Sequence, residues 1–197
     1  MRRVVVTGLG IVSSIGTNAE EVLASLKAGR SGITANEQMK EHGFRSQIAG
    51  AVDIDVSEHV DKRTLRFMGP GAAYAHIAMQ QAIADSGLEE SEVVNPRTGL
   101  IAGSGGPSTS ALLSAHQTVL KSGGTKRVGP FAVPKAMCST VSANLSTAFK
   151  IKGINYSITS ACSTSLHCIG NAAEQIMMGK QDVMFAGGVA DAVQRGR

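Results

Sequence analysis

A cysteine between a predicted strand and a predicted helix is the residue of this sequence best placed for chemistry. Ser160 can cap a helix that starts directly after it, which places Cys162 in the first helical turn. There the unpaired backbone N–H groups and the positive end of the helix dipole favour a thiolate over a thiol. The same N–H groups can stabilise an oxyanion on a carbonyl bonded to the sulfur. The turn is therefore typical of an acyl-transfer nucleophile.

The same cysteine also fits an inert structural role. It recurs at three- and four-residue steps with apolar residues of the predicted helix, so we expect it on the buried stripe of that helix. Buried thiols are usually unreactive, and the spacing alone leaves both interpretations open. Cys168 follows Cys162 by six residues, which places it roughly 200° or more around the helix, and it is predicted to be a core residue. The residues that share the stripe with Cys162 are Leu166, Ile169, Ala173 and Ile176.

The elements that must position these residues alternate between strands and helices. A capping box of Thr17 and Glu20 predicts the start of the first helix. Residues 30–66 lack strong periodicity and are expected to run over the surface. Residues 107–152 are expected to contain a loop rich in glycine, lysine and arginine, followed by a helix. Strands separated by helices indicate an α/β fold with a largely parallel sheet. We expect strands at residues 4–7, 98–102, 154–158 and 183–186, and further helices at 70–87, 141–149 and 161–178.

Length and composition place the chain among ordinary globular proteins. Its 197 residues correspond to one domain or a little more, with 43% hydrophobic and 17% charged residues. Five Phe, two Tyr and no Trp leave little for a surface that stacks nucleic-acid bases, so no nucleic-acid partner is expected. The net charge of +4 is too small to identify a partner unless the basic residues cluster. Glycine is abundant, with 23 residues.

The three cysteines indicate free thiols rather than disulfides or a metal site. Their positions form neither a CxxC pair nor a zinc-binding spacing, so we expect no metal and a reducing compartment. The amino-terminal apolar run is much shorter than that of a signal peptide, and no run is long enough to span a membrane. The cytoplasm is therefore the expected location, with no membrane contact.

Two other enzyme classes fit the residues less well. Gly8 and Gly10 follow a predicted strand as in a dinucleotide-binding loop, but Ser13 stands where that motif needs its third glycine. A cysteine hydrolase needs a histidine base with an orienting partner, and the spacing identifies none. Neither class is favoured.

Residues 155–165 closely resemble the nucleophile motif of the β-ketoacyl-acyl-carrier-protein synthases, condensing enzymes of the thiolase superfamily. Residues 6–13, 99–106 and 167–172 match the same family in order, and the similarity is greatest to its synthase I type. The resemblance covers nearly the whole chain. It implies a thiolase-like N-terminal half over residues 1–190, with a mostly parallel mixed sheet flanked by helices and the nucleophile at the N-terminus of a buried helix.

The resemblance also implies a reaction. Cys162 would take an acyl chain from the acyl carrier protein as a thioester, and a malonyl-carrier protein would then lose CO₂ and attack that thioester. No metal or organic cofactor is implied, because phosphopantetheine arrives on the carrier protein, and the family forms homodimers. The family's two catalytic histidines and its lysine lie in a C-terminal half that these residues do not match, and residues 191–197 diverge into a basic tail. A truncated synthase is therefore expected; the alternative is a fragment or interaction subunit that can be acylated but does not condense.

Further site residues follow from the same resemblance. Met137 corresponds to a residue that lines the acyl pocket, and Gly105 and Gly106 correspond to glycines beside it. An ordinary core methionine and a simple tight turn are the alternatives. The residues that match the carrier-protein docking surface, with a solvated charged surface as the alternative, are Lys62, Arg63, Arg66, Lys126 and Arg127.

The histidines are not expected to be catalytic. His167 lies in a matching segment, but its position five residues after Cys162 points it away from the nucleophile's side of the helix, so it is interpreted as structural. The histidines expected on the surface are His42, His59, His76 and His116.

Overall fold

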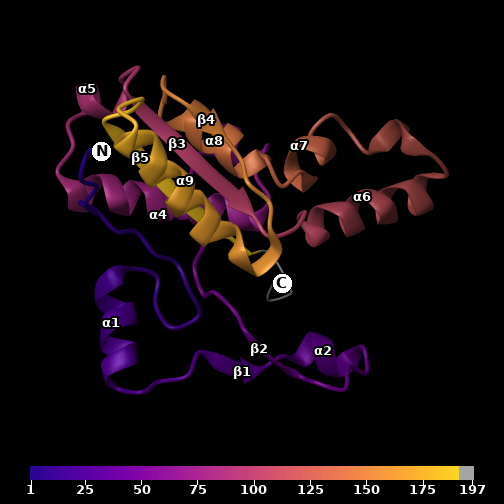
Figure 1. Ribbon diagram of the computed structural model, residues 1–197. Coiled ribbons are helices and arrows are strands. Elements are labelled where there is room, and N and C mark those ends of the chain that lie inside the picture. The colour runs from indigo at the N-terminus through magenta and orange to yellow at the C-terminus, as the bar shows by residue number, and fades with distance from the viewer. Residues whose placement is uncertain (191–197) are drawn as a thin grey trace.

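The computed structural model describes residues 1–190 and gives an α/β arrangement (Figure 1). Short 3₁₀ turns lie at η1 (Val56–Glu58), η2 (Thr125–Arg127) and η3 (Ala161–Ser163). The strands are β1 (Ile33–Ala35), β2 (Ile48–Gly50), β3 (Thr98–Ser104), β4 (Asn155–Tyr156) and β5 (Val183–Val189). The helices are α1 (Ala19–Lys27), α2 (Glu37–Glu41), α3 (Lys62–Leu65), α4 (Pro70–Ser86), α5 (Glu90–Val93), α6 (Thr109–Ser122), α7 (Ala132–Ala136), α8 (Thr140–Ala148) and α9 (Thr164–Met177).

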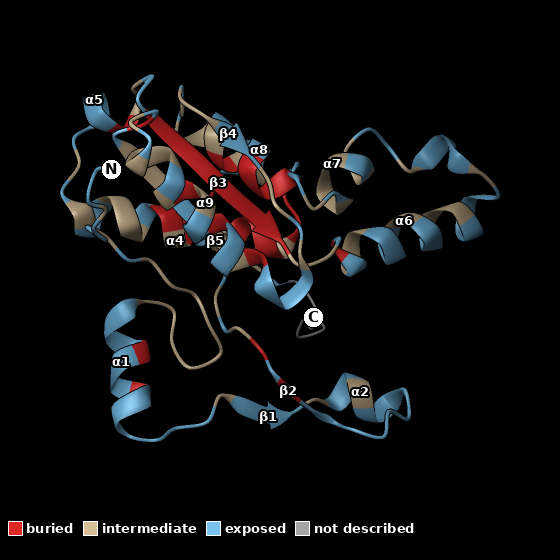
Figure 2. Ribbon diagram, viewed as in Figure 1, coloured by how far each residue is buried: buried red, intermediate tan, exposed pale blue. Residues whose placement is uncertain are grey.

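A parallel sheet in the order β4-β3-β5 forms the centre of the molecule. Every residue of β3 is buried (Figure 2). Leu100 and Ala102 pack with residues of α4 and α8, whereas Ile101 packs with Cys168 and Ala172 of α9. Because alternate side chains of a strand point to opposite faces, α9 covers one face of the sheet and α4 and α8 cover the other. The predicted α/β fold with a parallel sheet is confirmed.

The predicted strand at residues 4–7 is wrong. This segment makes no strand pairing, and Val6 is 87% exposed. The segment that follows lies along α4, where a Cβ on Gly10 would be 1.7 Å from the carbonyl oxygen of Ala78. The N–H of Ile11 donates to the side-chain oxygen of Gln81 at 3.0 Å. Side chains of α4 thus take backbone groups that a strand neighbour would otherwise satisfy.

Two helix predictions needed correction. The side chain of Asn18, rather than Thr17, caps α1 by accepting from the N–H of Glu21 at 2.9 Å, and the Thr17 N–H donates to the Glu21 carboxylate at 2.8 Å. The segment expected to be a loop contains α6, capped by Ser108 and with no buried residue. Helix α6 therefore contributes no residue to the core of the described chain.

Helix α6, η2 and α7 form an arm that projects beyond the sheet (Figure 1). The arm is attached at its base, where the N–H of Ser108 donates to the carbonyl oxygen of Ala136 at 3.1 Å. The ring of Phe131 meets the ring of Phe67 edge-on, with ring centroids 5.1 Å apart, which attaches the arm to the segment after α3.

Residues 30–66 run mostly over the surface, as expected, and include the antiparallel pair β1–β2. Helix α4 also follows its prediction, since Pro70 begins it and Gly87 ends it in the left-handed conformation with φ of 70°. No helix within residues 1–190 is long and apolar enough to cross a membrane.

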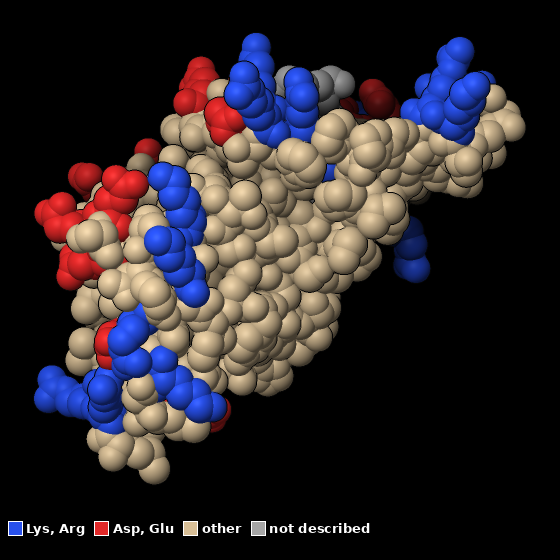
Figure 3. Space-filling model, turned by 90° about the horizontal axis from the view of Figure 1, so that it is seen from above, with Lys and Arg blue, Asp and Glu red and all other residues tan. Residues whose placement is uncertain are grey.

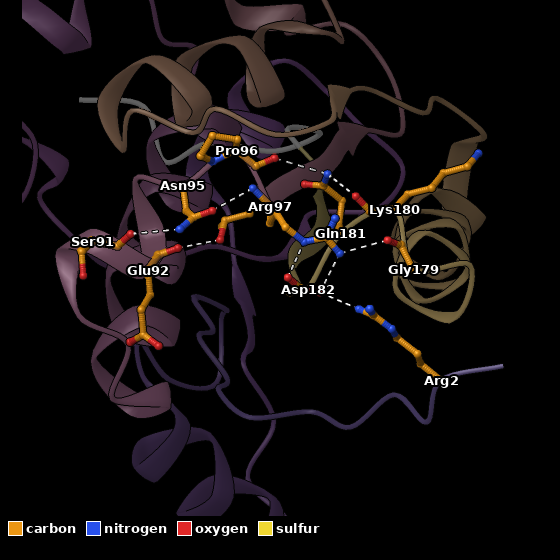
Figure 4. A network of polar contacts seen from close by, with 11 residues as sticks. Arg2, Ser91, Glu92, Asn95, Pro96, Arg97, Gly179, Lys180, Gln181 and Asp182 are labelled. Carbon is orange, nitrogen blue, oxygen red and sulfur yellow. Dashed lines mark hydrogen bonds and ion pairs between the residues drawn. The ribbon is translucent and has the colours of Figure 1, made fainter.

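A polar network joins the N-terminal segment to the amino-terminal ends of β3 and β5 (Figure 4). Asp182 accepts hydrogen bonds from Arg97 in a bidentate pair and from Arg2 at 2.5 Å. These hydrogen bonds hold the pKa of the Asp182 carboxyl well below its usual range. The Arg97 guanidinium also donates to the carbonyl oxygen of Gly179 at 2.9 Å, which fixes the turn between α9 and β5.

Candidate active site

Cys162 lies in the turn that leads from the carboxyl end of the sheet into α9. It is part of η3, and α9 begins only at Thr164, with Ser163 in the capping position. Cys162 thus lies two residues before α9, in a 3₁₀ turn that leads into it rather than in the first turn of the α-helix that the sequence predicted. Ser160 precedes η3, and its side chain makes no capping hydrogen bond to the backbone.

Hydrogen bonds within the turn hold it in a sharp conformation. Ala161 has a φ of 51°, in the left-handed region that residues other than glycine rarely adopt. The hydroxyl of Thr164 accepts from the N–H of Ser160 at 2.9 Å and donates to the carbonyl oxygen of Ala161 at 2.8 Å. The N–H of Ser163 donates to the carbonyl oxygen of Ser160 at 3.1 Å. Thr164 is buried, so these bonds anchor the turn to the start of α9.

Glycines at the ends of β3 and β5 let the sheet approach this turn closely. A Cβ on Gly105 would be 2.8 Å from the carbonyl oxygen of Ala161, and one on Gly188 would be 2.6 Å from the hydroxyl of Ser165. A Cβ on Gly106 would meet no atom within 4 Å. Close approach of the backbone therefore explains why glycine stands at positions 105 and 188, but it does not explain the glycine at position 106.

Cys162 is exposed, and so are its two neighbours in η3. The sequence placed it on the buried stripe of the helix, and that prediction is wrong. The sheet-facing residues of α9 are Thr164, Cys168 and Ala172, whereas Leu166 is 72% exposed. The inert buried thiol is instead Cys168, as predicted, and burial raises the pKa of its thiol.

His167 lies one turn into α9 and reaches back to the residue before η3. Its Nδ1 is 2.7 Å from the hydroxyl oxygen of Ser160. The imidazole is exposed to solvent, and Ser160 is partly exposed. The sequence interpretation gave His167 a structural role but did not identify Ser160 as its partner, because the left-handed turn that brings them together has no sequence signature.

The residues expected to line the acyl pocket are divided between two places. Met137 ends α7, is 50% exposed, and lines a small cavity of about 20 Å³ together with Gly106, Gly69 and Lys135. Gly105 instead faces the turn before Cys162. Cys162 does not line this cavity.

A larger cavity of about 660 Å³ lies between the N-terminal segment, α4, α9 and β5. Its lining is mostly apolar and includes Val6, Ala78, Ile176 and Phe185. The sequence did not indicate it, because residues 4–7 were expected to be part of the sheet. Within residues 1–190, no group of three or more metal-binding side chains lies together.

The basic residues expected to dock a partner lie on two separate segments, and all are exposed. Asp61 caps α3 by accepting from the N–H groups of Arg63 and Thr64, which orients this short helix. Figure 3 shows basic side chains at the end of the projecting arm, separated by uncharged surface from the other basic groups of that face. Lys62, Arg63 and Arg66 lie on and directly after α3, whereas Lys126 and Arg127 lie on η2.

His76 is buried, and its assignment to the surface is wrong. It packs against Phe149 with ring centroids 4.8 Å apart, and its Nδ1 has no hydrogen-bond partner. Burial lowers the pKa of His76, while the Asp61 carboxylate acts in the opposite direction. Small residues on several sides of α4 let neighbouring elements pack around it, which a single apolar stripe does not predict. His42, His59 and His116 are exposed, as predicted.

A family model described as "Beta-ketoacyl synthase, N-terminal domain" matches residues 1–196. The chain is 54% identical over 191 residues to 3-oxoacyl-[acyl-carrier-protein] synthase 1 of Haemophilus influenzae, and 56% identical over 189 residues to that of Escherichia coli. These matches cover 97% and 95% of this chain and 47% of each relative. The chain therefore spans about half the length of these relatives.

A solved structure shares the fold. The ishigamide ketosynthase/chain length factor superposes with a TM-score of 0.85 at 28% identity, over 97% of this chain and 48% of that one. The resemblance noted in the sequence is confirmed, including its restriction to an N-terminal half. The exposed cysteine turn at the end of a parallel sheet, the family match and the shared fold agree: the chain belongs to the beta-ketoacyl synthase family and corresponds to its N-terminal domain.

Proposed function

We propose that this chain supplies the nucleophilic half of a 3-oxoacyl-acyl-carrier-protein synthase of fatty-acid biosynthesis. The observation that carries the proposal is the exposure of Cys162 in a firmly held turn at the carboxyl end of a parallel sheet. An exposed thiol at such a turn can meet a thioester, whereas Cys168 is buried between α9 and the sheet and cannot.

The first step is transfer of an acyl group to Cys162. Its thiolate attacks the carbonyl carbon of an acyl group carried on the phosphopantetheine thiol of the carrier protein. The carbon–sulfur bond to the carrier breaks, the acyl group stays on Cys162, and the carrier thiolate leaves and takes a proton from solvent. The chain itself needs no cofactor for this exchange.

Condensation is the second step of the proposed reaction. A malonyl-carrier protein loses CO₂, and the resulting carbanion attacks the Cys162 thioester, which lengthens the acyl chain and releases the thiolate. The groups that assist decarboxylation lie, by the family resemblance, in the C-terminal half. Residues 1–197 alone are therefore proposed to accept the acyl group without condensing it.

The acyl carrier protein is the proposed macromolecular partner. The exposed residues Lys62, Arg63 and Arg66 of the α3 region, with Lys126 and Arg127 of η2, are proposed to dock its acidic surface. Met137 and Gly106, which share one cavity, and Gly105 beside the nucleophile turn are proposed to border the acyl chain. A flexible methionine side chain suits a wall that adapts to alkyl chains.

A second copy of the chain is proposed to cover the arm. Leu112, Leu113 and Leu120 of α6 are each about half exposed or more, and α6 buries no residue within the described chain. Such a row of apolar residues favours a protein contact over solvent, which is consistent with a homodimer. The cytoplasm is the proposed location, because reducing conditions keep the three cysteines as free thiols.

The test is acyl transfer followed by intact-mass analysis. The purified chain is mixed with carrier protein bearing a medium-chain acyl group, and a mass gain of one acyl group is expected on the wild type but not on Cys162→Ser. A Cys168→Ser variant should still be acylated. Addition of malonyl-carrier protein should yield no 3-oxoacyl product. If Cys162 stays unmodified, the proposal is wrong. Efficient condensation by residues 1–197 would refute the proposal that this chain accepts the acyl group without condensing it.

A further inference from the structure

The turn that presents Cys162 needs contacts that hold it in an unfavourable backbone conformation. Ala161 is not a glycine, yet it has a φ of 51°, and such residues persist where surrounding structure fixes them. On the buried side of the turn, the Thr164 hydroxyl accepts a hydrogen bond from the N–H of Ser160 and donates one to the carbonyl oxygen of Ala161. These bonds fix the backbone on the buried side of η3.

A second attachment comes from the solvent side. The Nδ1 atom of His167 lies 2.7 Å from the Ser160 hydroxyl oxygen, within ordinary hydrogen-bond distance. Side chains of a helix point toward its N-terminus, so a residue in the first turn of α9 can reach back over η3. The bond joins the residue before η3 to α9 and thereby closes a loop that contains Cys162.

The position of this pair separates it from the core. His167 is exposed and Ser160 is partly exposed, so removal of either polar group leaves no large cavity. Both ring tautomers are compatible with the bond, since the hydroxyl can donate to a bare Nδ1 or accept from an Nδ1–H. What the pair supplies is a fixed distance across the turn.

From these contacts we propose that His167 is a positioning residue for Cys162, acting through its hydrogen bond to Ser160. This inference rests on the proposed role of Cys162 as the nucleophile. His167 does not exchange a proton with the substrate in this scheme; it keeps the Ser160–Ser163 segment in the conformation that presents the thiol. Loss of the bond lets the turn relax and lowers the fraction of molecules with a correctly placed sulfur.

The experiment measures two rates at Cys162 in a Cys138→Ser background, so that the remaining second cysteine is the buried Cys168. The rates are alkylation by iodoacetamide and acylation by acyl-carrier protein. Ser160→Ala and His167→Ala should each slow both reactions about fivefold, the rate equivalent of one neutral hydrogen bond. The double variant should be no slower than either single variant, because both substitutions remove the same bond.

Conservative variants distinguish positioning from acid–base catalysis. An asparagine amide can place a polar atom near the site of Nδ1, whereas a glutamine amide places it near the site of Nε2. His167→Asn should therefore restore most of the rate and His167→Gln should not, although neither side chain titrates near neutral pH. A proton-transferring histidine would instead be rescued by neither variant. The exposed His116 gives the control, since His116→Ala should leave both rates unchanged.

The outcomes separate this inference from the proposed function. Equal alkylation rates in all variants would overturn the positioning role, even if Cys162 accepts acyl groups normally. Absence of acylation in the parent protein would reject the proposed function, while the alkylation series would still decide the role of His167. Urea unfolding midpoints of the variants, measured in parallel, exclude a loss of rate through global unfolding; a loss that tracks the midpoints would count against the proposal.

Discussion

Gly105 lies against Ala161 so closely that a Cβ on the glycine would be 2.8 Å from the alanine's carbonyl oxygen. This contact joins the end of the central strand β3 to the turn that carries Cys162. The same carbonyl oxygen accepts the hydroxyl hydrogen of Thr164 at 2.8 Å. The left-handed Ala161 is therefore held between the sheet on one side and the start of α9 on the other.

Gly105→Ala should reduce the reactivity of Cys162. The added methyl group would meet a backbone carbonyl oxygen of the turn. Because no flexible side chain can move aside to relieve this contact, the backbone of the turn must shift. Since a misplacement on the order of 1 Å can cost ~100-fold in rate, we expect acylation of Cys162 to fall by about tenfold or more. The measurement is the rate of acyl transfer from acyl-carrier protein, with iodoacetamide alkylation as a second readout.

Gly170→Ala is the matched control, because Gly170 is exposed on α9 and a Cβ at that position would meet no atom within 4 Å. It should change the acylation rate less than about twofold by the usual tolerance of open surface positions. Equal losses in the two variants would mean that close packing against Ala161 is not what matters at Gly105.

Arg66→Glu should weaken binding of the acyl carrier protein in a salt-dependent way. Arg66 is exposed directly after α3, beside Lys62 and Arg63, so reversal of its charge reduces attraction to an acidic surface. At low ionic strength we expect the dissociation constant to rise about tenfold, and the difference should shrink as salt screens the charges. The dissociation constant is measured by fluorescence anisotropy of a labelled carrier protein over a series of salt concentrations.

Lys152→Glu makes the same change in charge at the amino-terminal end of β4, away from the turn that carries Cys162. Its effect on the dissociation constant should be small. A loss as large as that of Arg66→Glu would show that net charge governs the association and that no docking surface lies at α3.

The parts of the fold with strong local signals were predictable from the sequence. Pro70 and Gly87 mark both ends of α4, and the apolar runs at β3 and β5 form neighbouring strands of the parallel sheet. The prediction of a strand at residues 4–7 was wrong because the backbone pairing of this region depends on α4. The Gln81 and Asp85 side chains of α4 accept hydrogen bonds from backbone N–H groups of the segment that follows residues 4–7. Apolar content alone does not contain that information.

The candidate site was also only partly predictable from the sequence. Spacing from Cys162 to Leu166 and Ile169 assumes one continuous α-helix, but η3 winds at about three residues per turn and so rotates Cys162 out of register with α9. The cysteine was identified correctly as the candidate nucleophile, but its exposure was not. The contact between Ser160 and His167 depends on the left-handed Ala161, which no residue preference predicts.

The buried His76 should make the stability of the protein depend on pH. Burial lowers its pKa in the folded state below the ordinary value of 6.5, so at acidic pH the unfolded chain binds more protons than the folded one. The contribution of His76 to stability is therefore complete above about pH 6.5 and is lost as the pH falls below that value. The Asp61 carboxylate reduces the effect without reversing it.

His76→Leu removes this titration, and the comparison is the free energy of unfolding from urea titrations between pH 5 and 8. Relative to the variant, the wild type should lose stability below pH 6.5, with a slope no steeper than about 1.4 kcal/mol per pH unit for one proton. His116→Leu changes an exposed histidine and should keep the wild-type slope. If the His76→Leu and wild-type curves run parallel through this range, the imidazole takes up its proton equally well in both states, and burial against Phe149 does not control it.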